Sequence, residues 1–380
     1  MGVGRRSSGK MVQSDYTASL ESDARSTGGR VGRIVTLTLL ILVAIEVAVE
    51  IRVYVRYGVT ALDTLRNQPL YVTDRDTGLR LLRPNSLIQG RQQTIQTNSL
   101  GLRSPEIPLA HTPHSLRLAV IGASSVMGAT ERDNEHTFPA QLEAQLREAL
   151  PGRRVDVINA GIAGYSLSDE RAMLERRIAP LHPDLILLYP GSNDFAGYCW
   201  FPVRTQARVS RQPMLSMPRW WLSYELLKQN TADLRVVPST TRTTRNAKEV
   251  DLREYRVDAE HLLATGQQLG IPQVLLTNAR SFRRNQPLQE QLRLSSMSRY
   301  YASCFDLEGL HTLWDRHNDL LVDIASEHSV PLLPLDKLVP GGDTYFANGN
   351  HFSEFGDLFV ARVIAHYLID HHLLPAEDPR

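Results

Sequence analysis

The sequence has little excess charge and few of the residue patterns that hold metals, nucleotides or nucleic acids. Its 42 basic and 41 acidic residues give a formal net charge of +1, so no strong overall field attracts an anionic polymer. The 12 histidines show no paired metal-ligand spacing apart from His371-His372, and neither a Gly-x-Gly-x-x-Gly turn nor a Walker loop is present. We therefore expect no metal, no cofactor and no nucleic-acid partner.

Cysteine is also scarce, because Cys199 and Cys304 are the two in the chain. If the chain is exported, an oxidising compartment permits a disulfide between them. The alternative is a pair of half-buried free thiols. The remaining composition, with 42% hydrophobic and 22% charged residues, is ordinary for a folded globular protein.

A long apolar run lies near the N-terminus. Residues 34–55 are mostly apolar, although Glu46, Glu50 and Arg52 interrupt them. A bilayer span needs about 20 predominantly apolar residues, and charged groups near a helix end can reach the interface. We expect a single transmembrane helix over 34–55, with an amphipathic interfacial helix as the alternative.

The flanks of this run predict its orientation. Residues 1–33 contain twice as many basic as acidic side chains and are rich in Ser and Gly, which favours a disordered cytoplasmic tail. The large domain then lies outside the cytoplasm, in a periplasm or at the cell surface. A cleaved signal peptide is disfavoured because no small-residue cleavage site follows; the chain continues Glu50-Ile51-Arg52-Val53-Tyr54.

The rest of the chain divides into a turn-rich approach segment, 60–115, and a regular α/β domain, 116–380. We expect the approach segment to contribute short strands that pack on the main domain. From residue 116, short apolar runs alternate with amphipathic stretches, which predicts a doubly wound, flavodoxin-like parallel sheet with helices on both faces. The expected strands are 116–121, 155–159, 184–189, 273–277 and 330–335, and the expected helices are 137–150, 168–179, 251–269, 307–328 and 353–368.

An insertion over 195–250 interrupts this alternation with three tryptophans, four prolines and a polar Ser/Thr/Arg tract. It follows a candidate site loop directly, so it can be a lid that contacts substrate. The alternative is a segment that covers hydrophobic surface and ends in a solvated loop.

Four short runs carry the chemistry. Three of them follow the first three predicted strands, and parallel sheets bind ligands at the carboxyl ends of their strands. The fourth run precedes the last helix and can return to the same edge. The runs are Gly122-Ala123-Ser124-Ser125, Asn159-Ala160-Gly161-Ile162-Ala163-Gly164, Gly191-Ser192-Asn193-Asp194 and Asn348-Gly349-Asn350-His351.

Together these runs contain the parts of an acyl-transfer site. The Ser124 hydroxyl is a weak nucleophile until a base takes its proton, and His351 suits that task because its unperturbed pKa lies near neutrality. The backbone N–H groups of Ser124 and Gly164 and the side-chain amide of Asn193 are candidate donors to an oxyanion.

These four runs resemble the motif blocks of the SGNH hydrolases, also called GDSL-type esterases and lipases. The residues that give that family its name correspond to Ser124, Gly164, Asn193 and His351, and the resemblance spans about residues 95–370. The segment Thr97-Asn98-Ser99-Leu100-Gly101-Leu102-Arg103 resembles that of membrane-attached members. The resemblance implies a serine esterase with an acyl-enzyme intermediate.

The chain departs from the family pattern at two positions. Ala123 stands where the family name implies Asp, a position that many relatives relax. Asn348 stands where the last block has the Asp that orients the histidine. Three groups can orient His351 instead: the Asn348 carbonyl oxygen, as in papain-like enzymes, a backbone carbonyl, or Asp343 from the same loop.

We therefore expect a membrane-tethered serine esterase that acts on a small-molecule, lipid or glycan ester outside the cytoplasm. One alternative is an O-acyltransferase or deacetylase that uses the same site on envelope glycans. Another is a catalytically inactive binding domain, because Asn348 replaces the usual Asp.

Overall fold

The computed structural model describes residues 32–52, 54–55, 70–89, 93–108, 114–200 and 245–376. The chain divides into two compact units: Met1–Asn67 with Pro213–Asn230, and Gln68–Gln212 with Thr231–Arg380. The expected tail, 1–33, and insertion, 195–250, lie mostly outside the described residues, so their predicted roles stay predictions.

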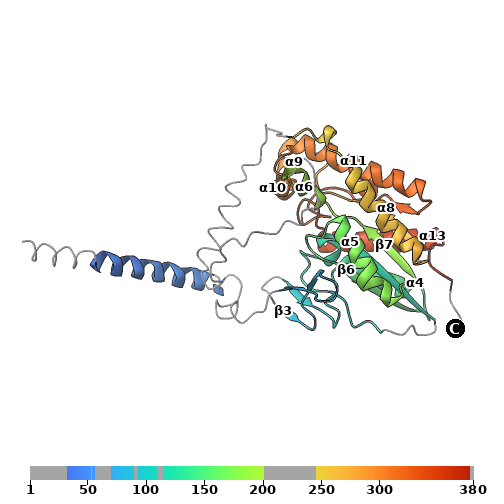
Figure 1. Ribbon diagram of the computed structural model, residues 1–380, viewed down its shortest axis with the longest axis horizontal. Helices are drawn as coiled ribbons and strands as arrows, with labels where there is room; N and C mark the ends of the chain where they lie inside the picture. Colours follow the sequence, from blue (N-terminus) through green and yellow to red (C-terminus); the bar gives the residue numbers. More distant parts are fainter. Residues whose placement is uncertain are drawn as a thin grey trace, which may run out of the picture. The chain divides into compact units, whose positions relative to one another are not determined.

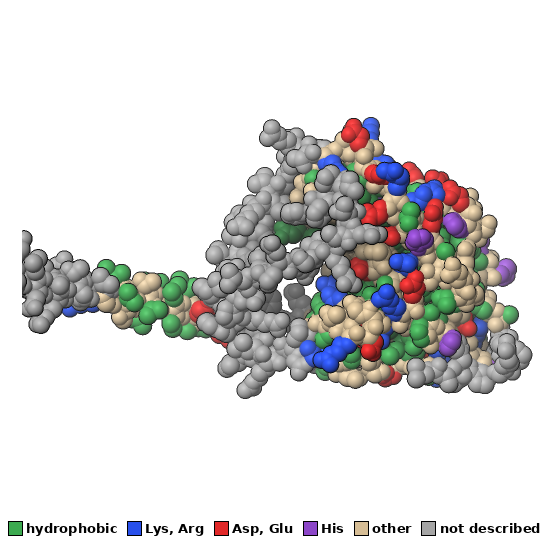
Figure 2. Space-filling model, in the orientation of Figure 1, with side chains coloured by type: hydrophobic (Ala, Val, Ile, Leu, Met, Phe, Trp, Pro, Cys, Tyr) green, Lys and Arg blue, Asp and Glu red, His purple; other side chains and the backbone are tan. Residues whose placement is uncertain are grey.

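The described part of the first unit is a helix, Gly32–Arg52, with a mean hydropathy of 2.5 in its most apolar window. Its large apolar side chains are exposed, and Figure 2 shows them along its length. By length and composition this helix can cross a membrane, a property that a signal sequence near the N-terminus shares.

The second unit is built on a five-stranded parallel sheet (Figure 1). The strand order is β6-β5-β7-β8-β9, which is the flavodoxin-like order 2-1-3-4-5. The first three strands are almost wholly buried, as expected where helices cover both faces. The predicted fold class is therefore confirmed. The strands are β5 (Ser115–Gly122), β6 (Arg154–Gly161), β7 (Leu185–Tyr189), β8 (Gln273–Leu276) and β9 (Leu332–Leu333).

Helices cover the two faces of this sheet with separate apolar cores. On one face, α5 (Leu167–Met173), α8 (Arg253–Gln268) and the C-terminal half of α11 (Leu307–Glu327) pack on the sheet. On the other face lie α4 (Phe138–Ala149) and α13 (Glu354–Asp370). The shorter elements are α3 (Ser124–Met127), α6 (Asp194–Trp200), α9 (Leu288–Leu294), α10 (Ser296–Tyr301), α12 (Leu335–Leu338) and the 3₁₀ turn Ala247–Glu249.

Residues before the sheet form two antiparallel strand pairs. Strand β1 (Tyr71–Thr73) pairs with β2 (Arg80–Leu82), and β3 (Leu87–Gln89) pairs with β4 (Thr94–Gln96). Leu79, Leu81 and Leu82 are buried in the same core as α5 and α8. This segment therefore packs on the sheet domain through apolar side chains.

Two predicted elements differ from the structure, and proline contributes to both differences. The predicted strand 330–335 shrinks to the two residues of β9, because Pro331 and Pro334 flank it and lack the N–H that a ladder requires. The predicted helix 168–179 is α-helical to Met173, then forms a π turn over Leu174–Ile178 and a 3₁₀ turn, Ala179–Leu181, that contains Pro180.

Cys199 and Cys304 form a disulfide, the first of the two alternatives that the sequence left open. Cys199 lies on α6, which follows the Asn193 run, and Cys304 lies between α10 and α11. The bond thus joins segments 105 residues apart in sequence. Both sulfurs lie at a small apolar core that includes Phe195 and Trp314.

His317 on α11 lies inside the same region and is 2% exposed. Its Nδ1–H donates to Leu313 O (2.8 Å), and its Nε2 accepts from the Tyr198 hydroxyl (3.0 Å). These two bonds fit a neutral ring, and burial lowers the pKa of His317 to about 3.

We predict that His317→Asn removes part of the acid sensitivity of folding. Below pH 6.5 His317 binds a proton in the unfolded chain but stays neutral in the folded chain. This group therefore lowers the free energy of unfolding by about 1.4 kcal/mol for each pH unit below 6.5. The difference in unfolding free energy between parent and variant should therefore narrow as the pH falls. Urea unfolding at pH 7, 6 and 5 measures it, with the exposed His261→Asn as control. Parallel pH curves for parent and His317→Asn would contradict the prediction.

Candidate active site

The first three motif runs lie at the carboxyl ends of three neighbouring strands. Strand β5 pairs with β6 and β7 so that Gly122 is level with both Gly161 and Tyr189. Ser124 begins the short helix α3 two residues beyond Gly122. The three strands end at one level of the sheet, which places the three runs side by side, as expected from the sequence.

The backbone around Ser124 leaves no room for side chains. A Cβ on Gly161 would lie 2.2 Å from the backbone nitrogen of Met127 in α3, which is a steric clash. A Cβ on Gly191 would lie 2.8 Å from Cβ of Ala123. Glycine at 161 and 191 therefore lets the second and third runs lie directly against the serine turn.

His351 contacts the serine hydroxyl. Its Nε2 lies 2.7 Å from Ser124 Oγ, which is a hydrogen-bond distance for a base and its nucleophile. The ring belongs to the loop between α12 and α13. Ser353, two residues after His351, is the N-cap of α13, and its hydroxyl accepts from Gly356 N–H.

Asn348 lies behind the histidine. Its Oδ1 is 2.9 Å from His351 Nδ1 and also faces the backbone N–H groups of Asn350 (3.4 Å) and His351 (3.3 Å). The two backbone N–H donors identify this atom as the oxygen of the amide. Nδ1 therefore carries the proton, and Nε2 is free to accept one from Ser124.

Asp343 has a different partner. Its two carboxylate oxygens accept from Arg293 Nη1 (2.9 Å) and Nη2 (2.6 Å), and both side chains are exposed. The structure thus places Asn348 against His351 and leaves Asp343 in a surface ion pair.

A hydrogen bond connects the runs that contain Gly164 and Asn193, the other two candidate oxyanion residues. Gly164 has φ of +83°, a left-handed conformation that favours glycine. The Asn193 side-chain amide donates to Tyr165 O (2.9 Å), one residue after Gly164. The two runs are therefore held together next to the serine turn.

Three polar side chains within the runs were not assigned a role from the sequence. The Ser125 hydroxyl donates to Asn350 O (2.9 Å), and Asn350 Nδ2 donates to Ser192 Oγ (3.1 Å). These bonds link the three runs that contain Ser124, His351 and Asn193. Their positions inside the four runs could have marked them as site residues. Their contacts could not be predicted, because they join segments far apart in the sequence.

A buried pair of acids links the Asn193 run to α5, the helix that follows the Gly164 run. Glu170 of α5, which is fully buried, accepts from Gly191 N–H (3.3 Å), and Asp194 accepts from Leu167 N–H (3.2 Å). Burial, with Asp194 nearby, raises the pKa of Glu170 well above its ordinary value. Burial therefore favours the uncharged form of Glu170 behind the Asn193 run.

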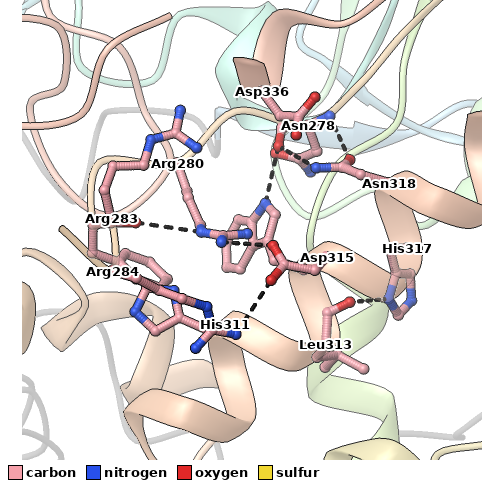
Figure 3. A network of polar contacts seen from close by, with 12 residues as sticks. Asn278, Arg280, Arg283, Arg284, His311, Leu313, Asp315, His317, Asn318 and Asp336 are labelled. Atoms are coloured by element: carbon pink, nitrogen blue, oxygen red, sulfur yellow. Dashed lines mark hydrogen bonds and ion pairs between the residues drawn. The ribbon is translucent and has the colours of Figure 1, made fainter.

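The Asn193 run is also supported from α11 through Asn278, whose contacts with Asn318 are drawn in Figure 3. Asn278 follows β8 and donates through Nδ2 to Pro190 O (2.9 Å), the residue before Gly191. Its backbone N–H and C=O are both bound by the Asn318 amide (2.8 and 3.0 Å). This buried network holds the base of the third run in place.

The described residues contain one cluster with metal-ligand atoms close together, formed by Glu260, Glu327 and His328. Both carboxylates already accept from Arg256 at 2.8 Å. The cluster lies on α8 and at the end of α11, outside the four runs, and we assign it no metal.

We predict that the pKa of His351 lies below 6.5. Its burial favours the neutral ring, and this outweighs the opposing influence of Glu131. The measurement is a pH titration of ¹³C-labelled histidine rings by NMR, with the His351 signal identified by its loss in His351→Gln. A titration midpoint above 6.5 would contradict the burial that we describe.

Comparisons with known proteins found similarity among solved structures. No protein-family model and no curated protein match the sequence. Among solved structures, a lipase/acylhydrolase from Enterococcus faecalis is similar, with 16% identity, 69% of this chain and 99% of that chain covered, and a TM-score of 0.42.

Two further structures are similar to the same extent. A protein assigned to the G-D-S-L lipolytic family of Desulfitobacterium hafniense has 11% identity, covers 66% of this chain and 98% of its own, and has a TM-score of 0.39. Axe2, an acetylxylan esterase from Geobacillus stearothermophilus, has 16% identity, 67% and 93% coverage and a TM-score of 0.39. With its four motif residues at one edge of a 2-1-3-4-5 parallel sheet, the chain resembles the SGNH hydrolases in fold and in motif order.

Proposed function

We propose that this protein is a membrane-tethered serine esterase whose catalytic domain lies outside the cytoplasm. The observation that carries the proposal is the relay from Asn348 Oδ1 to His351 Nδ1 (2.9 Å) and from His351 Nε2 to Ser124 Oγ (2.7 Å). A serine, a neutral imidazole and an acceptor behind it are the groups that acyl transfer requires.

In the proposed reaction, Ser124 Oγ attacks the ester carbonyl carbon while His351 Nε2 takes its proton. The carbonyl oxygen becomes an oxyanion, bound by the N–H groups of Ser124 and Gly164 and by the Asn193 amide. His351 then gives its proton to the leaving alcohol, and an acyl-Ser124 ester remains. Water attacks this ester with His351 again as base, which releases the acid and restores Ser124.

The neutral orienting residue is compatible with activity. In a serine protease, Asp-to-Asn at this position costs about 10⁴ in rate because the ring adopts the wrong tautomer. Here the oxygen of Asn348 is fixed by three N–H groups, so the amide faces the ring as an acceptor and selects the productive tautomer. This contact also disfavours the alternative of an inactive binding domain.

Two features support the extracytoplasmic placement. The apolar helix Gly32–Arg52 follows a tail with a basic excess, which favours a cytoplasmic N-terminus. The Cys199–Cys304 disulfide is typical of proteins that fold in an oxidising compartment. A small-molecule, lipid or glycan ester of the cell envelope is then the expected substrate, and transfer of the acyl group to a glycan hydroxyl is the alternative outcome at the same site.

We predict that a fluorophosphonate probe labels the full-length protein at Ser124 and that the protein hydrolyses short-chain esters. Ser124→Ala should abolish labelling, and His351→Ala should lower kcat/KM by more than about 10³. Asn348→Ala should lower it by about 10 to 100, because the ring loses its acceptor. Asp343→Ala, which removes only a surface ion pair, is the matched control.

Two results would contradict or redirect this assignment. Absence of labelling in the parent would refute both hydrolysis and transfer. Labelling with slow hydrolysis that sugar acceptors accelerate would identify an acyltransferase.

We predict the topology from the same features. Alkaline phosphatase fused after Arg380 should be active, because that enzyme needs an oxidising compartment to form its disulfides. A fluorescent reporter that folds in the cytoplasm should be inactive at the same position. The reverse pattern would place the catalytic domain in the cytoplasm and refute the orientation.

A further inference from the structure

The proposed mechanism leaves one electrostatic problem unsolved. When His351 takes the proton of Ser124, the ring becomes a buried imidazolium cation, and burial disfavours charge. A carboxylate at the orienting position would stabilise that cation. Asn348 supplies an acceptor for Nδ1–H but no negative charge, so the charge has to come from elsewhere.

We propose that Glu131 supplies this negative charge, acting on His351 through the protein interior without direct contact. Glu131 does not touch the reacting atoms. Its negative charge stabilises the positively charged His351 ring, which the neutral amide of Asn348 cannot do. This inference rests on the proposed esterase function and names how its base is tuned.

The position of Glu131 links it to both reacting side chains. It lies in the turn after α3 and is 2% exposed. The Thr130 hydroxyl lies 2.9 Å from Glu131 Oε1 and 3.1 Å from Phe352 O, the residue that follows His351. On the other side, Ala129 N–H donates to Ser124 O (3.1 Å). The residues next to Glu131 in sequence thus contact both the serine turn and the histidine loop.

A second acid, Asp357 of α13, shares the site of Glu131 and is completely buried. Its Oδ1 accepts from Phe138 N–H (3.0 Å), and no N–H or O–H of the described residues reaches its Oδ2. Burial, with the Glu131 carboxylate beside it, raises the pKa of Asp357 well above its ordinary value. Asp357 therefore favours its protonated form, in which its O–H can donate to the Glu131 carboxylate.

Arg103 is the cation nearest to this pair, but its hydrogen bonds go mainly to backbone oxygens. It donates to the carbonyl groups of Thr94, Met127, Gly128 and Glu131 and to the Asn134 side chain. The Glu131 carboxylate is held instead by the Thr130 backbone N–H (3.1 Å) and hydroxyl. Its charge is therefore reduced by Arg103 but not cancelled in a direct ion pair.

The effect on His351 has a definite sign. Burial lowers the pKa of His351, and Glu131 is the charged group that raises it. In an interior of low dielectric constant, a charge acts over several ångströms, well beyond contact distance. Glu131 thus makes His351 a stronger base than an equally buried ring beside a neutral amide alone.

The test compares charge with shape. We place Glu131→Gln and Glu131→Asp in the Asp357→Asn background, so that residue 357 cannot take up the charge that residue 131 loses. Gln keeps the size of the side chain and removes its charge, whereas Asp keeps the charge and shortens the chain. Asp133→Asn, an exposed acid two residues along the same turn, is the matched control.

We expect Glu131→Gln to lower the pKa of His351 by about 0.5 to 1 unit in NMR titration of the full-length protein. The acid limb of kcat/KM should move to lower pH by the same amount, and its plateau should fall about threefold to tenfold. Glu131→Asp, Asp357→Asn alone and Asp133→Asn should leave the pKa within about 0.2 unit of the parent.

Two outcomes would overturn the inference. If Gln leaves the pKa of His351 unchanged, or if Asp shifts it more than Gln does, the role of Glu131 is hydrogen bonding and not charge. Thermal unfolding checks that each variant is folded. The NMR titration needs no substrate, so an inactive parent would refute the esterase proposal while this inference is still decided.

Discussion

The site depends on the register of three parallel strands. Gly122 at the end of β5 is level with Gly161 of β6 and Tyr189 of β7, so the chain leaves the sheet at one level in all three places. A shift of any strand along its neighbour would separate the serine from the runs beside it. The sheet thus sets the positions of the runs before any side chain contributes, and the hydrogen bonds between runs refine them.

Strands, fold class and the four runs could be predicted from the sequence because they depend on local patterns. Apolar β-branched runs between amphipathic stretches predict a parallel sheet whatever the tertiary contacts are. The predicted strand 330–335 is shorter in the structure, because Pro331 and Pro334 limit β9 to two residues. The π turn after Met173 was not predicted, since no sequence pattern that we recognise signals it.

The buried acids could not be predicted in the same way. Glu131 and Asp357 are separated by more than 200 residues, and acidic side chains are rarely buried, so the sequence alone favours exposed positions for both. Their burial depends on α13 packing beside α4 and the serine turn, a tertiary contact with no local signal. Glu170 and Asp194 present the same difficulty. In each pair, burial beside a second acid raises the pKa of one member, Glu170 or Asp357, and so favours its uncharged form.

The disulfide has a consequence for how the fold tolerates change. Cys199 is bonded to Cys304, and the carbonyl oxygen of the adjacent Tyr198 accepts from Arg245, so α6 is held to two later segments of the chain. The disulfide closes a loop between residues 105 apart in sequence. Such a cross-link restricts the unfolded chain and lowers its entropy, so the fold can tolerate substitutions elsewhere that weaken its packing.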